Sequence, residues 1–249
     1  MRSLIVVKFG GSVVNDLYTR KKFIKEISYV SKEQNIILVH GGGLEITNLL
    51  NTFSLKSQFV NGLRYTDKDT ISIVEMALSG KVNRDLTTDL LQRGIKAVGM
   101  SGKDGNSVIC RQIKKLGYVG MPKTCNKELI EILINNHFIP VIASIANNSS
   151  GCVLNVNADT LAAFLAISFQ AKKLVYLTDV DGVVDQSGKI IQTLHTKRIN
   201  KLINDKIIKK GMIPKVRSCV QSVKKGVEEV WIIGNKSGIR KLKGTVIKK

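Results

Sequence analysis

The stretch ILVHGGGLEI, residues 37–46, places three consecutive glycines between an apolar run and the start of a helix-like segment. Glycine has no side chain, and it loses more conformational freedom on folding than any other residue. Three glycines together at the end of a strand therefore need a physical reason. Backbone N–H groups exposed at a helix N-terminus form a site for anions. We therefore expect a phosphate or a carboxylate to approach the backbone at this turn.

The same pattern recurs along the chain: an apolar run, a glycine or small polar turn, and an amphipathic segment. The runs are continuous rather than alternating, which is typical of strands buried on both faces. Strands that alternate with helices indicate a parallel sheet. The sequence predicts an α/β fold, a three-layer α-β-α sandwich around a mainly parallel open sheet. The predicted strands cover residues 4–11, 35–43, 95–102, 138–146, 173–182 and 229–235.

The chain contains only three prolines and no long polar linker, so we do not expect independent domains. The strand pattern starts afresh after residue 172, which predicts two lobes of one sheet, residues 1–172 and 173–249. Two segments, 61–70 and 110–124, interrupt the alternation of strands and helices. We predict that they form β-hairpins or lids near the site.

The net charge of +20, from 39 Lys and Arg against 19 Asp and Glu, is the most unusual bulk property. The basic residues are spread over the whole length, and aromatic residues make up only 5% of the chain. Single-stranded nucleic acids bind on aromatic stacking platforms, which are poorly supplied here. The composition therefore favours a solvated basic surface over a nucleic-acid-binding site.

Several function classes have no support in the sequence. The four cysteines and three histidines are dispersed without metal-site spacing, so we expect reduced cysteines and no protein-held metal. The signatures G-x-x-x-x-G-K-[ST], G-x-G-x-x-G and H-E-x-x-H are absent. No apolar run approaches the ~20 residues of a membrane span, and the N-terminal stretch does not resemble a secretory signal. We expect a soluble, cytoplasmic protein.

Two lysines and one aspartate stand where charged side chains need partners. Lys8 lies within the apolar run IVVKFGG, where an ammonium group is costly unless it meets an anion. Lys215 follows Pro214 at a predicted helix start. Asp159 belongs to LNVNADTLAAFLA, residues 154–166, where a polar group enters an apolar helix. We expect Asp159 to lie between the two lysines and to hold both ammonium groups.

Other candidates lie in turns after strands, because ligands of open α/β sheets gather beyond the carboxyl ends of the strands. Gly10-Gly11 and Gly41–Gly43 are predicted to bind phosphate through the backbone. Arg64 suits pairing with a carboxylate. Asn155 and Asn157 share one face of an extended run, and either Asn157 or Asp159 caps the following helix. The rim formed in this way also includes Ser101-Gly102 and Thr178-Asp179.

Taken together, these motifs resemble the amino-acid kinase family. The similarity covers nearly the whole chain and follows the family's order: VKFGGSV, VHGGGLEI, NGLRYTD, EMALSGKVN, GMSGKDG, GYVG, PVIASIA, LNVNAD, LTDVDGV and GMIPKV. LNVNAD followed about 50 residues later by GMIPKV resembles the branch that acts on N-acetyl-L-glutamate. The resemblance implies a carbamate-kinase-like fold and phosphoryl transfer from ATP to the substrate's side-chain carboxylate, a step of arginine biosynthesis that yields an acyl phosphate.

The resemblance also implies a role for each lobe. The N-terminal lobe would bind the amino-acid substrate and dimerise, and the C-terminal lobe would bind ATP, whose Mg²⁺ is held mainly by phosphates and water. Lys8 and Lys215 would stabilise the transferring group, and Asp159 would orient both lysines. The substrate would meet Gly42, Gly43, Arg64 and Asn155, and the phosphates Gly10 and Gly11. ATP would be bordered by Thr178, Asp179, Val180, Asp181, Gly182, Val183, Ile207, Ile208 and Lys209.

One departure from the family pattern leaves an alternative open. Arg64-Tyr65-Thr66 stands where the family usually has RVT, and RYT is similar to kinases of carrier-linked aminoadipate or glutamate. A strongly basic enzyme would suit an acidic carrier protein. A regulatory or nucleic-acid-binding protein on an inactive kinase scaffold is a more remote alternative. The intact Lys8, Asp159 and Lys215 argue against it.

The resemblance carries one expectation about assembly. Arginine-inhibited relatives have an N-terminal helix that links dimers into a hexamer, whereas only Met1–Ser3 precede the first predicted strand here. We predict a homodimer that is insensitive to arginine, with residues 67–80 in its interface.

Overall fold

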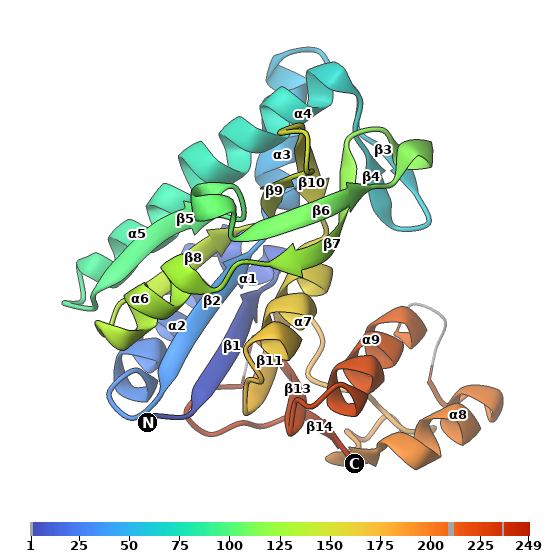
Figure 1. Cartoon of the computed structure of the whole chain (residues 1–249). Coiled ribbons are helices and arrows are strands. Elements are labelled where there is room, and N and C mark those ends of the chain that lie inside the picture. The colour runs from blue at the N-terminus through green and yellow to red at the C-terminus, as the bar shows by residue number, and fades with distance from the viewer. Residues whose placement is uncertain (1, 209–211, 236) are drawn as a thin grey trace.

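The computed structural model describes residues 2–208, 212–235 and 237–249. Their main feature is an eight-stranded sheet in the order β12-β14-β13-β11-β1-β2-β8-β5 (Figure 1). Neighbouring strands are parallel except β13 and β14, which are antiparallel. The strands are β1 (Leu4–Phe9), β2 (Asn35–His40), β5 (Ala97–Ser101), β8 (Ile139–Ala143), β11 (Lys173–Thr178), β12 (Thr193–His195), β13 (Glu229–Gly234) and β14 (Thr245–Lys248).

The central strands are apolar on both faces because both faces are covered. Val6 and Ile37 pack into one hydrophobic cluster, while Val7 and Leu38 pack into the cluster on the opposite side. Successive side chains of a strand point to opposite faces, so an unbroken apolar run fits a strand between two helical layers. The predicted three-layer α/β sandwich is confirmed.

Different helices cover the two faces (Figure 1). The cluster with Val7 includes buried side chains of α1, α2 and α5, and the cluster with Val6 includes those of α6, α7, α8 and α9. The helices are α1 (Gly11–Asn15), α2 (Leu17–Val30), α3 (Gly43–Thr52), α4 (Lys68–Glu75), α5 (Asn83–Leu91), α6 (Glu128–Asn135), α7 (Ala158–Ser168), α8 (Thr196–Asn204) and α9 (Ile213–Lys224). A π-helical segment, η1 (Met76–Val82), joins α4 to α5, and η2 (Asp104–Asn106) and η3 (Lys114–Leu116) are short 3₁₀ turns.

The two segments that interrupt the alternation contribute hairpins. β3 (Gln58–Val60) pairs with β4 (Leu63–Tyr65), and β6 (Val108–Gln112) pairs with β7 (Val119–Cys125). The second hairpin closes into a small barrel with β9 (Ile145–Asn147) and β10 (Val153–Val156). The prediction of one strand over 138–146 was wrong. β8 ends at Ala143 and β9 belongs to the barrel, a break that an apolar run does not reveal.

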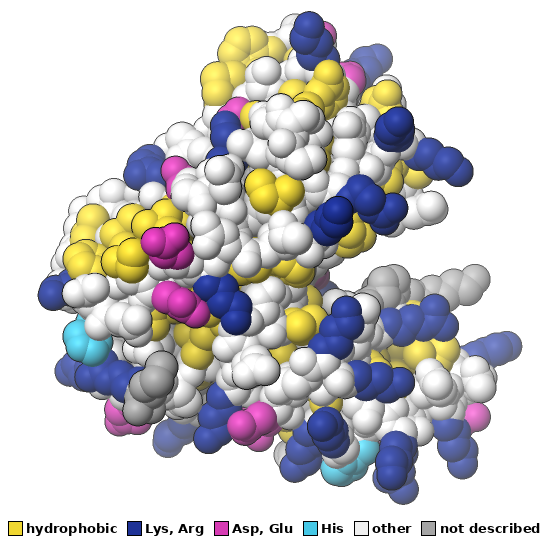
Figure 2. Space-filling view, in the orientation of Figure 1, with side chains coloured by type: hydrophobic (Ala, Val, Ile, Leu, Met, Phe, Trp, Pro, Cys, Tyr) yellow, Lys and Arg dark blue, Asp and Glu magenta, His cyan; other side chains and the backbone are white. Residues whose placement is uncertain are grey.

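The other predicted strands ran too far at their carboxyl ends. β1, β2 and β11 end at Phe9, His40 and Thr178, and the glycines and polar residues that follow belong to turns and helix starts. β1 pairs with β2 on one side and with β11 on the other, so the sheet continues across residue 172. Figure 2 shows a hollow between the surface over β6 and β7 and the surface over α8 and α9. Among the described residues, no helix is long and apolar enough to cross a membrane.

Candidate active site

The carboxyl ends of β1, β2 and β11 lie side by side at one edge of the sheet. Lys8 of β1 is in register with Val39 of β2 and Tyr176 of β11. The predicted rim thus brings Lys8 together with the glycine turn after β2 and the Thr178-Asp179 turn after β11. Ser101 and Gly102 also follow a carboxyl strand end, that of β5, but they line neither of the two cavities at this edge.

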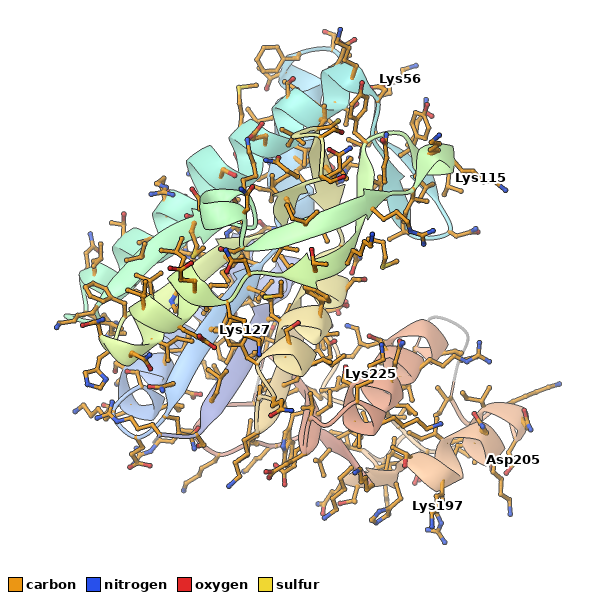
Figure 3. All side chains as sticks on the ribbon, in the orientation of Figure 1. Lys56, Lys115, Lys127, Lys197, Asp205 and Lys225 are labelled. Carbon is orange, nitrogen blue, oxygen red and sulfur yellow. The ribbon has the colours of Figure 1, made fainter. Side chains whose placement is uncertain are left out.

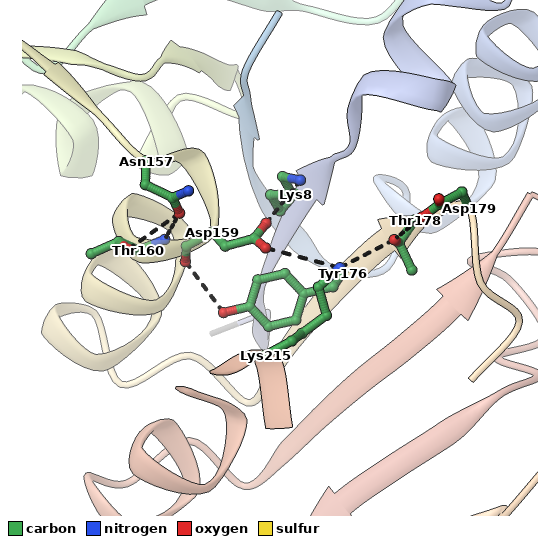
Figure 4. Close-up of polar contacts among 8 residues, drawn as sticks. All are labelled: Lys8, Asn157, Asp159, Thr160, Tyr176, Thr178, Asp179 and Lys215. Carbon is green, nitrogen blue, oxygen red and sulfur yellow. Dashed lines mark hydrogen bonds and ion pairs between the residues drawn. The ribbon is translucent and has the colours of Figure 1, made fainter. Parts of the chain in front are cut away.

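Asp159 joins the two predicted lysines (Figure 4). Lys8 Nζ lies 2.8 Å from Asp159 Oδ1, and Lys215 Nζ lies 3.9 Å from Asp159 Oδ2. The three side chains are largely shielded, with 13%, 29% and 21% exposed for Lys8, Asp159 and Lys215. Two cations share one carboxylate, so the cluster keeps a net positive charge. This charge favours an incoming anion, and the nearby carboxylate of Asp179, which interacts with both lysines, offsets part of it.

Local structure explains how the three side chains converge. Asn157 caps α7: its side-chain oxygen accepts a hydrogen bond from Thr160 N at 3.0 Å. Of the two residues predicted as caps, Asn157 is therefore the one that fills this position. Asp159 then stands in the first turn of α7, where the helix dipole favours a carboxylate. Lys215 lies in the first turn of α9, next to Pro214, as the sequence predicts.

A hydrogen-bonded chain continues from Lys215 into the turn after β11 (Figure 4). Lys215 Nζ donates to Thr178 Oγ1 at 3.1 Å, and the Thr178 hydroxyl donates to Asp179 Oδ1 at 2.8 Å. The hydrogen bond from Thr178 lowers the pKa of Asp179, and the charges of Lys215 and Lys8 lower it further. Asp179 is therefore ionised at neutral pH, and its turn is held against the lysine cluster.

Four of the five glycines predicted in the two turns show clear differences in what they face. A Cβ on Gly42 would lie 2.8 Å from Leu78 Cδ2, and a Cβ on Gly10 would lie 2.5 Å from Leu177 O. These two glycines are therefore required by packing, and the Gly10 amide already donates to Leu177 O at 2.9 Å. By contrast, a Cβ on Gly43 would meet nothing within 4 Å, and one on Gly11 only the Asn15 amide at 3.9 Å. Gly11 and Gly43 are thus the members of the two turns that are open to a ligand.

A cavity of about 510 Å³ lies between the glycine turns, the β3-β4 hairpin and the start of α7. Arg64 is 8% exposed and donates to Gly43 O and Thr47 Oγ1, each at 3.0 Å, and also to Ser57. Desolvation lowers the pKa of its guanidinium, which nevertheless stays charged because an arginine titrates so far above neutrality. Asn155 donates to Thr66 Oγ1 at 3.1 Å. The predicted residues that line this cavity are Lys8, Gly11, Gly41, Gly42, Gly43, Arg64, Asn155 and Asn157.

A second cavity, of about 630 Å³, lies beyond Lys215 in the C-terminal part of the chain. It is lined by eight of the nine residues predicted to border ATP; the ninth, Lys209, lies outside the described residues. Gly182 has a φ of +151°, and a Cβ there would lie 2.7 Å from Thr245 Oγ1. Lys8 lines the first cavity and Lys215 the second, so the two cavities adjoin at Asp159.

Sequence reasoning missed the apolar wall of the first cavity and part of the apolar wall of the second. Leu44, Phe59 and Leu78 line the first, and Ile190 and Met212 line the second. Apolar residues at a site have the same local pattern as core residues, so no sequence signal separates them. Phe59 has one sign of a special position, because its ring is 59% exposed and lies 4.7 Å from the Arg64 guanidinium carbon.

The arrangement can hold two anionic molecules and neutralise charge between them. No cluster of three or more His, Cys, Asp or Glu side chains in the described part of the chain is arranged to hold a metal ion. A cation that enters with a polyphosphate would therefore depend on phosphate and water oxygens. Such a site, with two lysines converging between adjoining cavities, is suited to transfer a phosphoryl group.

Comparisons with known proteins agree with this chemistry. Residues 3–234 match the amino acid kinase family, and the chain belongs to that family. The chain is 59% identical over its full length to an acetylglutamate kinase from Endomicrobium trichonymphae, with both chains covered completely. The resemblance of the motifs to this family is thus confirmed.

Solved structures agree with the fold. The chain superimposes on the crystal structure of smu.665 from Streptococcus mutans UA159 with a TM-score of 0.86 and 32% identity, covering 100% of this chain and 99% of that one. Carbamate kinase from Giardia lamblia, at 15% identity, has a TM-score of 0.71 over 100% of this chain and 99% of its own. The expected carbamate-kinase-like fold is confirmed.

Proposed function

We propose that this chain is an acetylglutamate kinase, which transfers the terminal phosphoryl group of ATP to the side-chain carboxylate of N-acetyl-L-glutamate. The product is an acyl phosphate, and the reaction belongs to arginine biosynthesis in the cytoplasm. The observation that carries the proposal is the convergence of Lys8 and Lys215 on Asp159 where the two cavities adjoin. The 59% identity to a complete acetylglutamate kinase supports the choice of acceptor.

Each part of the chain has its own ligand in this proposal. N-acetyl-L-glutamate occupies the first cavity, in residues 1–172, with its α-carboxylate at Arg64 and a further polar contact at Asn155. Its side-chain carboxylate points to Gly43 at the N-terminus of α3, where backbone N–H groups favour an anion. ATP enters the second cavity, in residues 173–249, as its Mg²⁺ complex, and its terminal phosphate reaches Lys215.

The chain's own residues do the catalytic work by positioning and charge. The acceptor carboxylate is already ionised at neutral pH, so it attacks phosphorus without a general base. Negative charge spreads over the oxygens of the transferring group, and Lys8 and Lys215 neutralise it from two sides. Asp159 fixes both ammonium groups in place before the substrates arrive.

The carrier-linked alternative depends on Tyr65, which lies outside the first cavity. Arg64 and Leu63 line that cavity, and Tyr65 is not among its lining residues. The change from RVT to RYT therefore places no new side chain in the lining of the acceptor site. The five lysines labelled in Figure 3 are exposed and belong to separate segments, which favours a solvated basic surface over one docking site among these residues.

The test is ADP release from Mg-ATP with N-acetyl-L-glutamate, free glutamate, aminoadipate or aspartate as acceptor. We expect turnover with N-acetyl-L-glutamate and a kcat about 100- to 1,000-fold lower in Lys215→Ala, because one stabilising cation is lost. Lys225→Ala, an exposed lysine at the end of the same helix, is the matched control and should behave as wild type. Turnover that needs a carrier-linked acceptor would reject the proposal in favour of the alternative.

For the assembly, we propose a homodimer that uses α4 and η1. Met76 at the start of η1 is 50% exposed, which leaves a large apolar side chain to be covered. Light scattering coupled to size exclusion, with and without arginine, tests both the dimer and its expected insensitivity to arginine. A monomer, or an arginine-inhibited hexamer, would contradict this part.

A further inference from the structure

His40 is buried directly behind the glycine turn, and the mechanism above does not use it. It is the last residue of β2, is fully buried, and lines neither cavity. Its Nδ1 lies 3.0 Å from Gly41 O, and its Nε2 lies 3.0 Å from Asn83 Nδ2. A carbonyl oxygen only accepts hydrogen bonds, so Nδ1 carries the proton and Nε2 accepts one from Asn83. Burial lowers the pKa of His40 to about 4, which keeps the ring neutral.

Asn83, the first residue of α5, is also fully buried. Its amide nitrogen lies 2.8 Å from Val141 O, 3.2 Å from Met100 O and 3.0 Å from His40 Nε2, so its two hydrogens are shared among three acceptors. The two carbonyl oxygens require an N–H donor, which fixes the orientation of the amide. With the amide nitrogen facing it, His40 Nε2 accepts, in agreement with a proton on Nδ1. The side chain connects three neighbouring strands, β2, β8 and β5.

The side-chain oxygen of Asn83 is unusual for a buried polar atom. Its Oδ1 has no hydrogen-bond partner and lies against Gly99, where a Cβ would overlap it. A buried acceptor without a partner is unfavourable. The donor contacts of the same amide account for an asparagine here, because an apolar residue would leave His40 Nε2 and two carbonyl oxygens without this N–H donor.

The helix that carries Asn83 holds the glycine turn at a second point. Leu78 and Val82 of η1 pack against Gly42. A Cβ on Gly42 would lie 2.8 Å from Leu78 Cδ2 and 3.0 Å from Val82 Cγ2. π-helical turns often occur at functional sites. The continuous segment α4-η1-α5 thus contacts Gly41 through His40 and contacts Gly42 directly.

We propose that His40 and Asn83 are positioning residues, which fix the Gly41 peptide and thereby aim the open Gly43 end of the turn at the acceptor. Asn83 sets the tautomer of the His40 ring, and His40 Nδ1–H donates a hydrogen bond to Gly41 O. The orientation of the Gly41 peptide then sets the direction of the backbone at Gly42 and Gly43. The kinetic consequence rests on the proposed function, whereas the tautomer and the hydrogen bonds do not. A displacement of about 1 Å at a reacting centre costs up to about 100-fold in rate.

Paired substitutions of His40 separate the two ring nitrogens. The side-chain nitrogen of His40→Asn can take the place of Nδ1 and keep the bond to Gly41 O, whereas the amide of His40→Gln reaches only the place of Nε2. We expect His40→Asn to retain most of the kcat, and His40→Gln and Asn83→Leu to lose about 10- to 100-fold. The KM for ATP should not change in any of them. Leu90→Val, a buried change two turns further along α5, is the matched control.

Amide NMR signals report the turn without any activity. The amide signals of Gly42 and Gly43 should shift in His40→Gln and Asn83→Leu but not in Leu90→Val. A wild-type kcat in both His40 variants would overturn the positioning role. Equal losses of kcat in both variants, explained entirely by the fraction of each protein that is unfolded, would overturn it as well.

The tautomer gives a readout that is independent of the acceptor. The chain has three histidines, so the His40 signals in a long-range ¹H–¹⁵N spectrum are those that disappear in His40→Gln. At pH 7 we expect a protonated Nδ1 and an unprotonated Nε2. The opposite tautomer, or a rapidly exchanging mixture, would overturn the inference. A wild-type chain that has the expected tautomer but fails to phosphorylate N-acetyl-L-glutamate would reject the proposed function instead.

Discussion

At the scale of single residues, the site depends on how one carboxylate is shared. Asp159 contacts Lys8 at 2.8 Å and Lys215 at 3.9 Å, so the shorter pair is the better formed in the absence of substrates. The longer distance leaves the Lys215 ammonium group available to a phosphate. Lys8 was predicted because a charge within an apolar run is costly without a partner. Lys215 was predicted from its place after Pro214 at a helix start, and Asp159 from the polar group that enters an apolar helix. The partners themselves come from segments far apart in the chain.

The first prediction concerns Asp159→Asn, which removes the shared charge but keeps the shape. Both lysines lose the group that orients them, so we expect kcat to fall about 100-fold or more while the chain stays folded. Steady-state kinetics and a thermal melt measure the two effects. Asp205→Asn, an exposed change at the end of α8, serves as the control. A kcat within a few-fold of wild type would contradict the orienting role.

A second prediction is a dependence of stability on pH that comes from His40. Burial lowers its pKa from 6.5 to about 4, so between these values the unfolded chain binds a proton that the folded chain does not. Stability from this group is therefore fully present above pH 6.5 and falls as the pH drops towards 4, by on the order of 3 kcal/mol. Urea unfolding across this range should show the decline in wild type and a weaker decline in His40→Asn. Equal slopes in both proteins would contradict the assignment.

At the scale of elements, the sequence predicted the strands that a local pattern marks, and it missed features that depend on contacts between distant segments or that leave no local mark. The runs that became β1, β2 and β11 are apolar on both faces, and glycine or polar residues mark their ends, so their pattern predicts buried strands. The break between β8 and β9 lies within an apolar run and leaves no such mark. The π-helical segment η1 was also missed, because its apolar residues follow nearly the period of an α-helix. The contact between His40 and Asn83 spans 43 residues, which no local pattern reports.

The two neighbouring glycines at the start of α3 give a third prediction. Gly42→Ala would place a Cβ against Leu78 and Val82, so we expect a loss of about 1–3 kcal/mol in unfolding free energy. Gly43→Ala meets open space and lies within a helix, so we expect unchanged or slightly higher stability. Its methyl group nevertheless enters the first cavity, so the KM for the acceptor should rise. Denaturant titration together with kinetics distinguishes the two, and a stability loss in Gly43→Ala alone would contradict this difference.

At the scale of the whole molecule, one sheet carries two cavities. β1 contributes Lys8 to the first cavity and pairs with β11, whose end borders the second. The division at residue 172 was predicted from a renewed strand pattern, and the sheet itself has no boundary there. The family resemblance indicated four apolar residues of the second cavity, Val180, Val183, Ile207 and Ile208. The other apolar wall residues were not predictable, because only the folded chain decides which apolar residues face a ligand.

The fourth prediction assigns each ligand to one part of the sheet. A non-hydrolysable ATP analogue should slow hydrogen exchange over residues 178–184, and N-acetyl-L-glutamate should slow it over residues 58–65 and at the start of α3. Protection of this kind follows because bound ligands stabilise the states that hold them. Protection of residues 58–65 by the ATP analogue alone would contradict the assignment of the cavities.

The most direct test of the central claim is to trap the product. Hydroxylamine converts an acyl phosphate into a hydroxamate, so the chain is incubated with Mg-ATP, N-acetyl-L-glutamate and hydroxylamine, and hydroxamate is measured against ADP. We predict equal amounts of the two products, formed only when the acceptor is present and nearly abolished in Lys215→Ala. ADP without hydroxamate, or hydroxamate that persists in the variant, would contradict phosphoryl transfer between the two cavities.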